Sequence, residues 1–124
     1  MEIGLSHTSI ITVTETNTAL TIGSGDLDVF ATPAMAALME NAAMKAVAES
    51  LPEGSTTVGS KLDINHLKSS ALGETISATA LLTEINGRKL TFTLKANDSH
   101  GLIGEGTHIR YIVEKEKFLS KLQS

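Results

Sequence analysis

The stretch Phe30–Asn41, FATPAMAALMEN, decides the fold, because it opens a long apolar helix and places one carboxylate inside it. Thr32 followed by Pro33 predicts the start of that helix, with the hydroxyl as N-cap and the proline in the first helical position. Ala, Met, Leu and Val continue to about Ser50, and the residues 52–55, Pro-Glu-Gly-Ser, end the helix. Apolar residues occur nearly all the way round, so we expect protein to cover this helix on most sides.

Glu40 is the carboxylate within this helix. Burying an ionised carboxylate costs several kcal/mol unless partners compensate for the lost water. We therefore expect desolvation to raise the pKa of Glu40 and to suit it to act as a base near neutral pH. The competing interpretation is an exposed glutamate on the polar face of an amphipathic helix.

Length and composition restrict the class of protein. The 124 residues fit one domain, 1–124, and a net charge of -4 without a basic run argues against nucleic-acid binding and membrane docking. The absence of cysteine excludes disulfides, thiolate metal sites and a cysteine nucleophile. The N-terminus lacks a signal-peptide pattern, and no apolar run approaches the ~20 residues that span a bilayer. We expect a cytoplasmic protein.

Extended segments flank the helix. Residues Thr8–Thr14 and Ala19–Ile22 are rich in β-formers, and Gly23–Asp26 separates them from the helix. Four further strands are predicted: Val58–His66, Thr75–Ile85, Leu90–Ala96 and Ile103–Val113. The turns between the last three are Asn86–Gly87, a hairpin signal, and Asp98–Gly101. The charged residues Glu114–Ser124 add a short terminal helix.

Alternation with period two assigns the faces of these strands. Each strand has one set of residues expected to share a face. In order of the four strands, these sets are Val58, Leu62, Ile64 and His66; Ile76, Ala78, Ala80 and Leu82; Leu90, Phe92, Leu94 and Ala96; and Ile109, Tyr111 and Val113. In the last strand, His108 and Arg110 are expected on the opposite face. The predicted fold class is α+β, an antiparallel β-sheet wrapped around one long central helix. Because the edge strands of such a sheet invite pairing, we expect a homodimer and leave a tetramer open.

The order of these elements resembles the hotdog fold, and the residues resemble the fluoroacetyl-CoA thioesterase-like branch of hotdog thioesterases. The residues that carry the resemblance are Val29–Thr32 before the helix, Glu40 within it, Val58–Gly59 and His66 on one strand, and Gly104–Arg110 near the end. The resemblance spans almost the whole chain. No single one of these elements is specific to that family, whereas the ordered set of elements with its spacings is specific to it.

The resemblance implies a catalytic constellation of Thr32, Glu40 and His66 at a dimer interface. It further implies that Gly59 offers its backbone to the thioester or to water, and we expect Arg110 and Phe30 to bind substrate as well. The expected reaction is hydrolysis of a short- or medium-chain acyl-CoA to the free acid and CoA. No metal and no cofactor are expected, since CoA is part of the substrate.

Thioester hydrolysis needs chiefly a base and donors for the tetrahedral oxyanion, because CoA thiolate is a fair leaving group. Glu40 is expected to act as base or to attack directly, and His66 to orient or share the proton. The hydroxyl of Thr32 would attack or position water. The free amides after Thr32, at the positive end of the helix dipole, form a natural oxyanion site.

Each of these side chains also has a purely structural interpretation. Thr32 is explained as an N-cap alone, and a histidine such as His66 on an apolar strand face is commonly a packed core residue. For His108 we favour a solvated strand face. Arg110 belongs either to that face or to a contact with substrate or a CoA phosphate. The glycine-containing segments 23–26 and 104–106 lack a phosphate-binding fingerprint and are interpreted as turns or bulges.

Spacing along the helix conflicts with a site made within one chain. If Thr32 caps the helix, Glu40 lies roughly 12 Å further along the axis and about 80° around it. Either the helix begins later, or a second protomer completes the site. We favour the dimer interface.

Substrate identity is the least determined part of the function. The enzyme that names the branch closes aromatic side chains over its substrate from the segment before the threonine, whereas Gly23–Asp28 holds no aromatic residue. We therefore do not expect fluoroacetyl specificity, and Met and Leu side chains of the helix are expected to line the acyl pocket. Two alternatives stay open: a non-catalytic dimer that binds acyl-CoA or another apolar ligand, and an enoyl-CoA hydratase, whose usual paired Asp and His motif is not evident.

Overall fold

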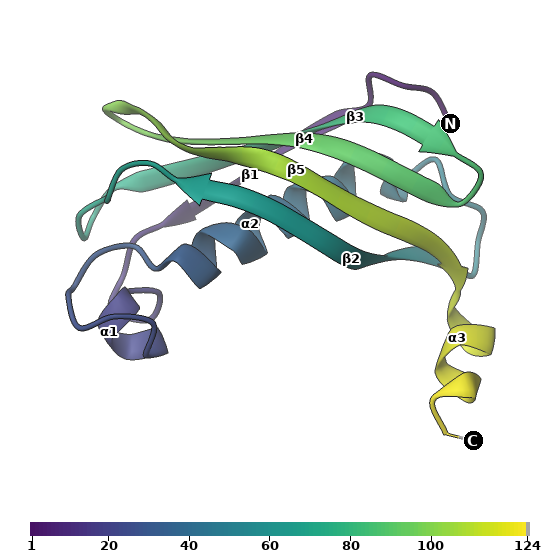
Figure 1. Ribbon diagram of the computed structural model, residues 1–124, viewed down its shortest axis with the longest axis horizontal. Coiled ribbons are helices and arrows are strands. Elements are labelled where there is room, and N and C mark those ends of the chain that lie inside the picture. Colours follow the sequence, from purple (N-terminus) through teal and green to yellow (C-terminus); the bar gives the residue numbers. More distant parts are fainter. Residues whose placement is uncertain (124) are drawn as a thin grey trace.

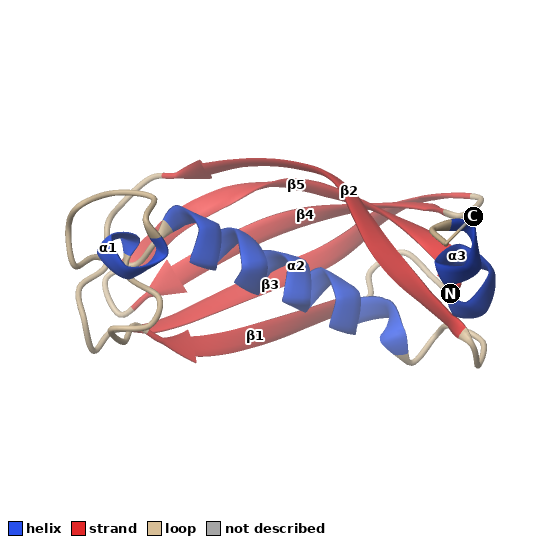
Figure 2. Ribbon diagram, turned by 90° about the horizontal axis from the view of Figure 1, so that it is seen from below, coloured by secondary structure: helices blue, strands red, loops and turns tan. Residues whose placement is uncertain are grey.

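The computed structural model describes residues 1–123 and shows one curled antiparallel sheet with a long helix lying in its concave face (Figures 1 and 2). The elements are β1 (Ser6–Thr12), α1 (Ala19–Ile22), α2 (Thr32–Ala48), β2 (Ser55–His66), β3 (Thr75–Asn86), β4 (Lys89–Asp98), β5 (Gly101–Glu114) and α3 (Lys115–Lys121). The strand order is β1-β3-β4-β5-β2, so β1 and β2 form the two edges. This arrangement confirms the predicted α+β architecture.

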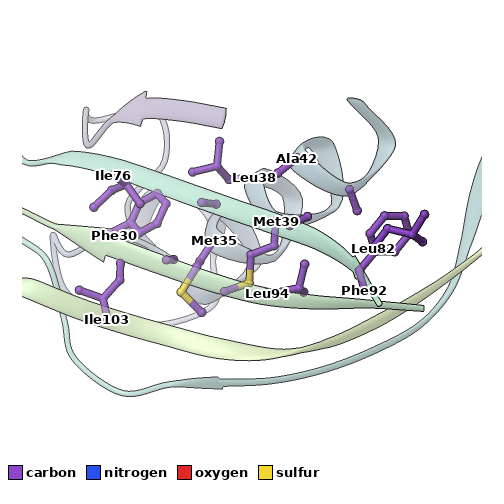
Figure 3. Packing of buried hydrophobic residues seen from close by; sticks show 14 of the residues in the cluster. Phe30, Met35, Leu38, Met39, Ala42, Ile76, Leu82, Phe92, Leu94 and Ile103 are labelled. Atoms are coloured by element: carbon purple, nitrogen blue, oxygen red, sulfur yellow. The ribbon is translucent and has the colours of Figure 1, made fainter. Parts of the chain in front are cut away.

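One face of α2 packs against the sheet and forms the core (Figure 3). Its buried residues are Met35, Leu38, Met39, Ala42, Ala43 and Val47. The inward faces predicted for β3 and β4 are confirmed, since all eight of their residues are at most 1% exposed. The opposite face of α2 is open in the single chain, where Ala37 and Lys45 are exposed. The expectation that protein covers the helix on most sides is therefore wrong for one chain.

The predicted connections around β4 are confirmed. Asn86 pairs with Lys89 across a two-residue turn in which Gly87 has a φ of 63°, and Asp98–Gly101 joins β4 to β5. The predicted terminal helix is α3. The segment Ala19–Ile22 is not extended as predicted. It is a short helix, because the hydroxyl of Thr18 accepts a hydrogen bond from the amide of Thr21 and caps it.

A β-bulge interrupts β2 between Gly59 and Lys61. Gly59 is paired with Arg110 and Lys61 with Ile109, so Ser60 has no paired position on β5; its Oγ lies 3.5 Å from the carbonyl oxygen of Ile109. One additional residue inverts the alternation of side chains on the strand. Val58 therefore points away from the face that holds Leu62, Ile64 and His66, and the prediction that all four share a face is wrong. Gly59 and Thr57 occupy the inward positions instead.

The inward face of β5 also differs from expectation. His108 is 1% exposed and Arg110 is 7% exposed, so the solvated face that we favoured for His108 is wrong; Tyr111, on the opposite face, is 40% exposed. The segment Gly104–Gly106 is regular strand rather than a turn. A β-carbon on Gly104 would lie 2.6 Å from the sulfur of Met35, so the glycine there lets helix and sheet approach closely.

Within residues 1–123, none of the helices combines the length and apolar character that crossing a membrane requires.

Candidate active site

Thr32 uses its hydroxyl for a contact with β2. It is the first helical residue of α2; Ala31 is the N-cap and makes no side-chain capping bond. The expectation that Thr32 is the N-cap is therefore wrong. Its Oγ1 lies 2.7 Å from Nδ1 of His66, the last residue of β2. Threonine and histidine, 34 positions apart in the sequence, thus form a hydrogen-bonded dyad.

The surroundings of His66 keep its imidazole neutral. Phe30 lies edge-on to the ring, with centroids 6.5 Å apart and an interplanar angle of 80°, and is itself 1% exposed. Burial lowers the pKa of His66 below its ordinary value, and the backbone of Lys68 offsets this only in part. Nε2 of His66 is buried and has no hydrogen-bond partner within residues 1–123. The ring is therefore neutral, with Nδ1 bonded to Thr32 and the second nitrogen without a side-chain partner within residues 1–123.

Glu40 lies further along α2 than this dyad, and its side chain is close to β2 and β5. Its side chain is 42% exposed, so the expectation of a buried carboxylate is wrong for the single chain. Oε2 lies 3.9 Å from Nε2 of His108. A β-carbon on Gly59 would come within 2.9 Å of the same oxygen and within 3.3 Å of Nη1 of Arg110. Only a glycine at position 59 leaves this space between carboxylate and guanidinium open.

Arg110 is held by three hydrogen bonds on the inner face of the sheet. Nε donates to Oγ1 of Thr57 at 2.8 Å, Nη2 donates to the carbonyl oxygen of Thr57 at 2.9 Å, and Nη1 donates to Nε2 of His108 at 3.1 Å. Burial lowers the pKa of Arg110, and the nearby charge of Glu40 opposes that shift. The guanidinium nevertheless remains a cation at neutral pH.

Thr57 and His108 are the two members of this cluster whose function the sequence did not indicate. Thr57 was missed because the bulge that turns it inward has no signature in the alternation pattern. His108 was assigned to solvent because nothing in the sequence marks the face of His108 and Arg110 as inward; both residues are buried in the structure.

An open hollow of about 460 Å³ lies between α2, β2 and β5. Glu40, Gly59 and Arg110 line it together with Met44. A carboxylate, a fixed cation and an apolar side chain therefore face one cavity, which suits a ligand that has both a polar carbonyl and a short aliphatic portion.

The predicted site residues thus form two groups within one chain. Phe30, Thr32 and His66 lie at the start of α2, whereas Glu40, Gly59 and Arg110 lie further along it. Eight residues of regular helix place Glu40 roughly 12 Å from Thr32 along the axis. A single chain does not bring the threonine, histidine and glutamate into one contact network.

The first turn of α2 supplies backbone donors beside the dyad. The amide of Met35 bonds to the carbonyl of Ala31, whereas the N–H groups before it have no intrahelical acceptor, and Pro33 has no N–H at all. The positive end of the helix dipole therefore lies next to the Thr32 hydroxyl.

Comparisons with known proteins identify the family of this chain. Residues 13–116 match the family model described as "Fluoroacetyl-CoA-specific thioesterase". The fluoroacetyl-CoA thioesterase of Streptantibioticus cattleyicolor is 36% identical over 96 residues, which are 77% of this chain and 69% of that protein.

Solved structures show the same fold. A crystal structure of the fluoroacetyl-CoA thioesterase FlK has a TM-score of 0.92 and 31% identity, with 99% of this chain and 96% of that chain covered. A thioesterase superfamily member from Thermus thermophilus has a TM-score of 0.91 and 27% identity, with 98% and 90% covered. A hot-dog-like protein from Thermanaerovibrio acidaminovorans, 23% identical over 99% of this chain and 91% of that one, has a TM-score of 0.90 and supports the fold alone. With the curled sheet, the central helix and the match over residues 13–116, the chain belongs to the fluoroacetyl-CoA-specific thioesterase family and has the hotdog fold.

Proposed function

We propose that this protein hydrolyses short- or medium-chain acyl-CoA thioesters to the free acid and CoA. The observation that carries the proposal is the hydrogen bond between Thr32 and His66 beside the start of α2, in a chain that belongs to a thioesterase family. The cavity that Met44 and Glu40 line has room for a short aliphatic group next to a carbonyl.

The dyad supplies a proton acceptor beside a hydroxyl. Neutral His66 accepts the proton of the Thr32 hydroxyl at Nδ1, which activates either that oxygen or a water that it orients. Attack on the thioester carbon forms a tetrahedral oxyanion, which the N–H groups of the first turn of α2 stabilise. The C–S bond then breaks and CoA leaves as the thiolate, which takes the proton that His66 accepted. If Thr32 is the nucleophile, a water activated by His66 then hydrolyses the acyl-threonine ester, which releases the free acid and restores the hydroxyl.

Glu40 joins this site in a homodimer. In the tautomer that accepts from Thr32, Nε2 of His66 carries the ring proton, and this buried donor needs an acceptor, which no side chain within residues 1–123 of one chain provides. A carboxylate from a second copy meets that need. It orients the imidazole and stabilises the positive charge that forms on it, as in other triads of hydroxyl, histidine and carboxylate.

The edge strand β2 offers the surface for this dimer. Antiparallel pairing of two β2 strands about a two-fold axis near Leu62 places Gly59 of one chain alongside the half of the partner's strand that ends at His66, because the two positions lie on opposite sides of Leu62 in the sequence. Glu40 lies against Gly59, so the partner's carboxylate comes to the Thr32–His66 dyad.

The test of activity is free-thiol release from a panel of acyl-CoAs, acetyl through palmitoyl and phenylacetyl, with wild type compared with Glu40→Gln at equal folded concentration. We expect turnover on the shorter chains and a loss of at least ~100-fold in the variant, because the imidazole then loses the carboxylate that orients it and stabilises its charge. Tight acyl-CoA binding without thiol release, unchanged in the variant, would instead indicate a binding module, and hydration of crotonyl-CoA would indicate an enoyl-CoA hydratase.

The composite site has its own test. Glu40→Gln and Thr32→Val chains, each inactive alone, are mixed and allowed to exchange subunits. In a mixed dimer one site has an intact dyad and an intact carboxylate, so random exchange should restore about a quarter of wild-type turnover. A site made within one chain would show no recovery. Light scattering on the same samples measures whether a dimer is present.

A further inference from the structure

His108 is a buried histidine for which the mechanism above has no use. Its ring lies between β2 and β5 and packs against Phe92, with ring centroids 6.3 Å apart. Nδ1 lies 2.7 Å from the carbonyl oxygen of Lys61, the first paired residue after the bulge in β2. Since a carbonyl only accepts, Nδ1 must carry the ring proton.

The second nitrogen of His108 is therefore an acceptor. Nε2 receives a hydrogen bond from Nη1 of Arg110 at 3.1 Å, and a guanidinium only donates. Both partners fix the same neutral tautomer. Glu40, 3.9 Å from Nε2, consequently faces a nitrogen lone pair rather than an N–H.

Arg110 does not pair directly with Glu40. No ion pair between them occurs in the part of the chain that the structure describes, 1–123, although both side chains line the same hollow. Thr57 and His108 occupy three of the five N–H groups of the guanidinium. An arginine freed from these acceptors would move across the space beside Gly59 and form an ion pair with the carboxylate, since opposite charges attract strongly in a partly dry site.

We propose that His108 is a positioning residue that holds Arg110 beside Glu40 without letting the two charges pair. The proposal rests on the proposed function, because it assigns Glu40 a role that a direct ion pair would suppress. Held in this way, the guanidinium presents its charge to the hollow where the substrate binds, and the carboxylate stays available to the dyad of the second chain.

The proposal makes the site sensitive to acid through His108. The charged groups that face the ring are Arg110 on its own strand and Glu40 on α2; β2 presents the Lys61 carbonyl, and β4 presents the apolar Phe92. Burial is the main cause that lowers the pKa of His108. Protonation at low pH places a donor on Nε2, which breaks the bond to Arg110, leaves the guanidinium only its two bonds to Thr57 and sets a cationic ring 3.9 Å from Glu40.

Two variants separate positioning from packing. In His108→Gln, the terminal amide oxygen reaches the place of Nε2 and still accepts from Arg110, but it does not titrate. In His108→Asn, the shorter amide reaches only the place of Nδ1, so Lys61 keeps a donor and Arg110 loses its acceptor. His100→Gln, at a histidine whose side chain is 76% exposed, is the matched surface control.

We expect kcat/KM for the best acyl-CoA to fall about 10- to 100-fold in His108→Asn, the size of effect that a misplaced group produces. His108→Gln should stay within about threefold of wild type, and its activity should decline less steeply than that of wild type as the pH falls. The loss in His108→Asn should disappear when Glu40→Gln is already present, because the two residues act on one another. Equal losses in the two His108 variants, or equal acid limbs in wild type and His108→Gln, would overturn the proposal.

A measurement without substrate tests the same geometry. Nitrogen-15 NMR of the four histidines, assigned with the His100 and His108 variants, should show His108 as the neutral Nδ1–H tautomer at pH 7. The Nε2–H tautomer would overturn the inference whatever the enzyme assay gives. A wild type that releases no thiol but shows the Nδ1–H tautomer would refute the proposed function alone, since Arg110 would still be held as described.

Discussion

Gly59 and Glu40 lie so close together that a β-carbon on the glycine would come within 2.9 Å of Oε2 of the glutamate. The same β-carbon would lie 3.1 Å from Cε1 of His108. The glycine is needed here for space rather than for an unusual φ angle, because Gly59 is not among the residues with positive φ. The proposed chemistry depends on the carboxylate of Glu40, and Gly59, the strand residue next to it, has no side chain.

Gly59→Ala should lower kcat markedly while leaving the fold intact. The methyl group displaces the end of a flexible, half-exposed side chain, which costs little stability, but it moves the carboxylate from its position. We expect a loss of about 10- to 100-fold in kcat and a melting temperature close to that of wild type. Thiol release and thermal unfolding on one preparation measure both; an unchanged kcat would show that the position of the carboxylate does not matter.

Gly104→Ala should lower the stability of the fold and leave kcat close to that of wild type. A β-carbon there would lie 2.6 Å from the sulfur of Met35 and 3.1 Å from the carbonyl oxygen of Asn65, and Met35 is fully buried. Overpacking of this kind costs about 1–3 kcal/mol of unfolding free energy. Urea denaturation gives that difference. A stability equal to that of wild type would mean that α2 moves away from β5 without cost.

Thr32→Val keeps the β-branched shape and removes the hydroxyl that bonds to His66. Turnover should fall by ~100-fold or more if this hydroxyl attacks the thioester or orients the water. Thr32→Ser is the matched control, because it retains a hydroxyl and should retain most of the activity. Since Thr32 makes no capping bond, the melting temperature should change little in either variant. Equal activity of the Val and Ser variants would remove the hydroxyl from the mechanism.

Stability should decrease as the solution becomes acidic. Burial lowers the pKa values of His66 and His108 below their ordinary value of 6.5. The unfolded chain therefore binds protons on these rings at a higher pH than the folded chain does, so the free energy of unfolding falls as the pH drops below about 6.5. Urea denaturation at pH 7.5 and at steps down to pH 5 measures this slope.

His108→Gln should flatten that slope, and His100→Gln should not. A slope that is the same in wild type and in His108→Gln would mean that His108 does not contribute to the acid sensitivity of the fold.

The helix and the inner faces of β3 and β4 could be predicted from the sequence because one physical rule governs each of them. Apolar residues at helical spacing must be buried, and alternating apolar residues in a strand must face one side. The same rules failed where a local hydrogen bond or an additional residue changed the geometry. The Thr18 cap turned Ala19–Ile22 into a helix, and the bulge at Ser60 reversed Val58.

The residues of the candidate site could be predicted from the sequence better than their arrangement in space. Thr32 and His66 do meet, and Glu40 and Gly59 are neighbours. The environment of Glu40 could not be predicted, because its exposure depends on what lies beyond the open face of α2. The face of His108 was misjudged because polar side chains on alternate strand positions ordinarily face water, whereas for Arg110 both that face and a contact with substrate had been left open.

The bulge in β2 also determines how this chain tolerates changes in length. Ser60 is not paired in register with any residue of β5, so its deletion would remove no paired position, yet it would turn Thr57 and Gly59 outward and Val58 inward. Arg110 would then lose both of its acceptors on Thr57, and a valine would stand beside Glu40. Almost any residue type could replace the Ser60 side chain, whereas the number of residues between Gly59 and Leu62 could not change. The constraint at this position is therefore on insertions and deletions rather than on substitutions.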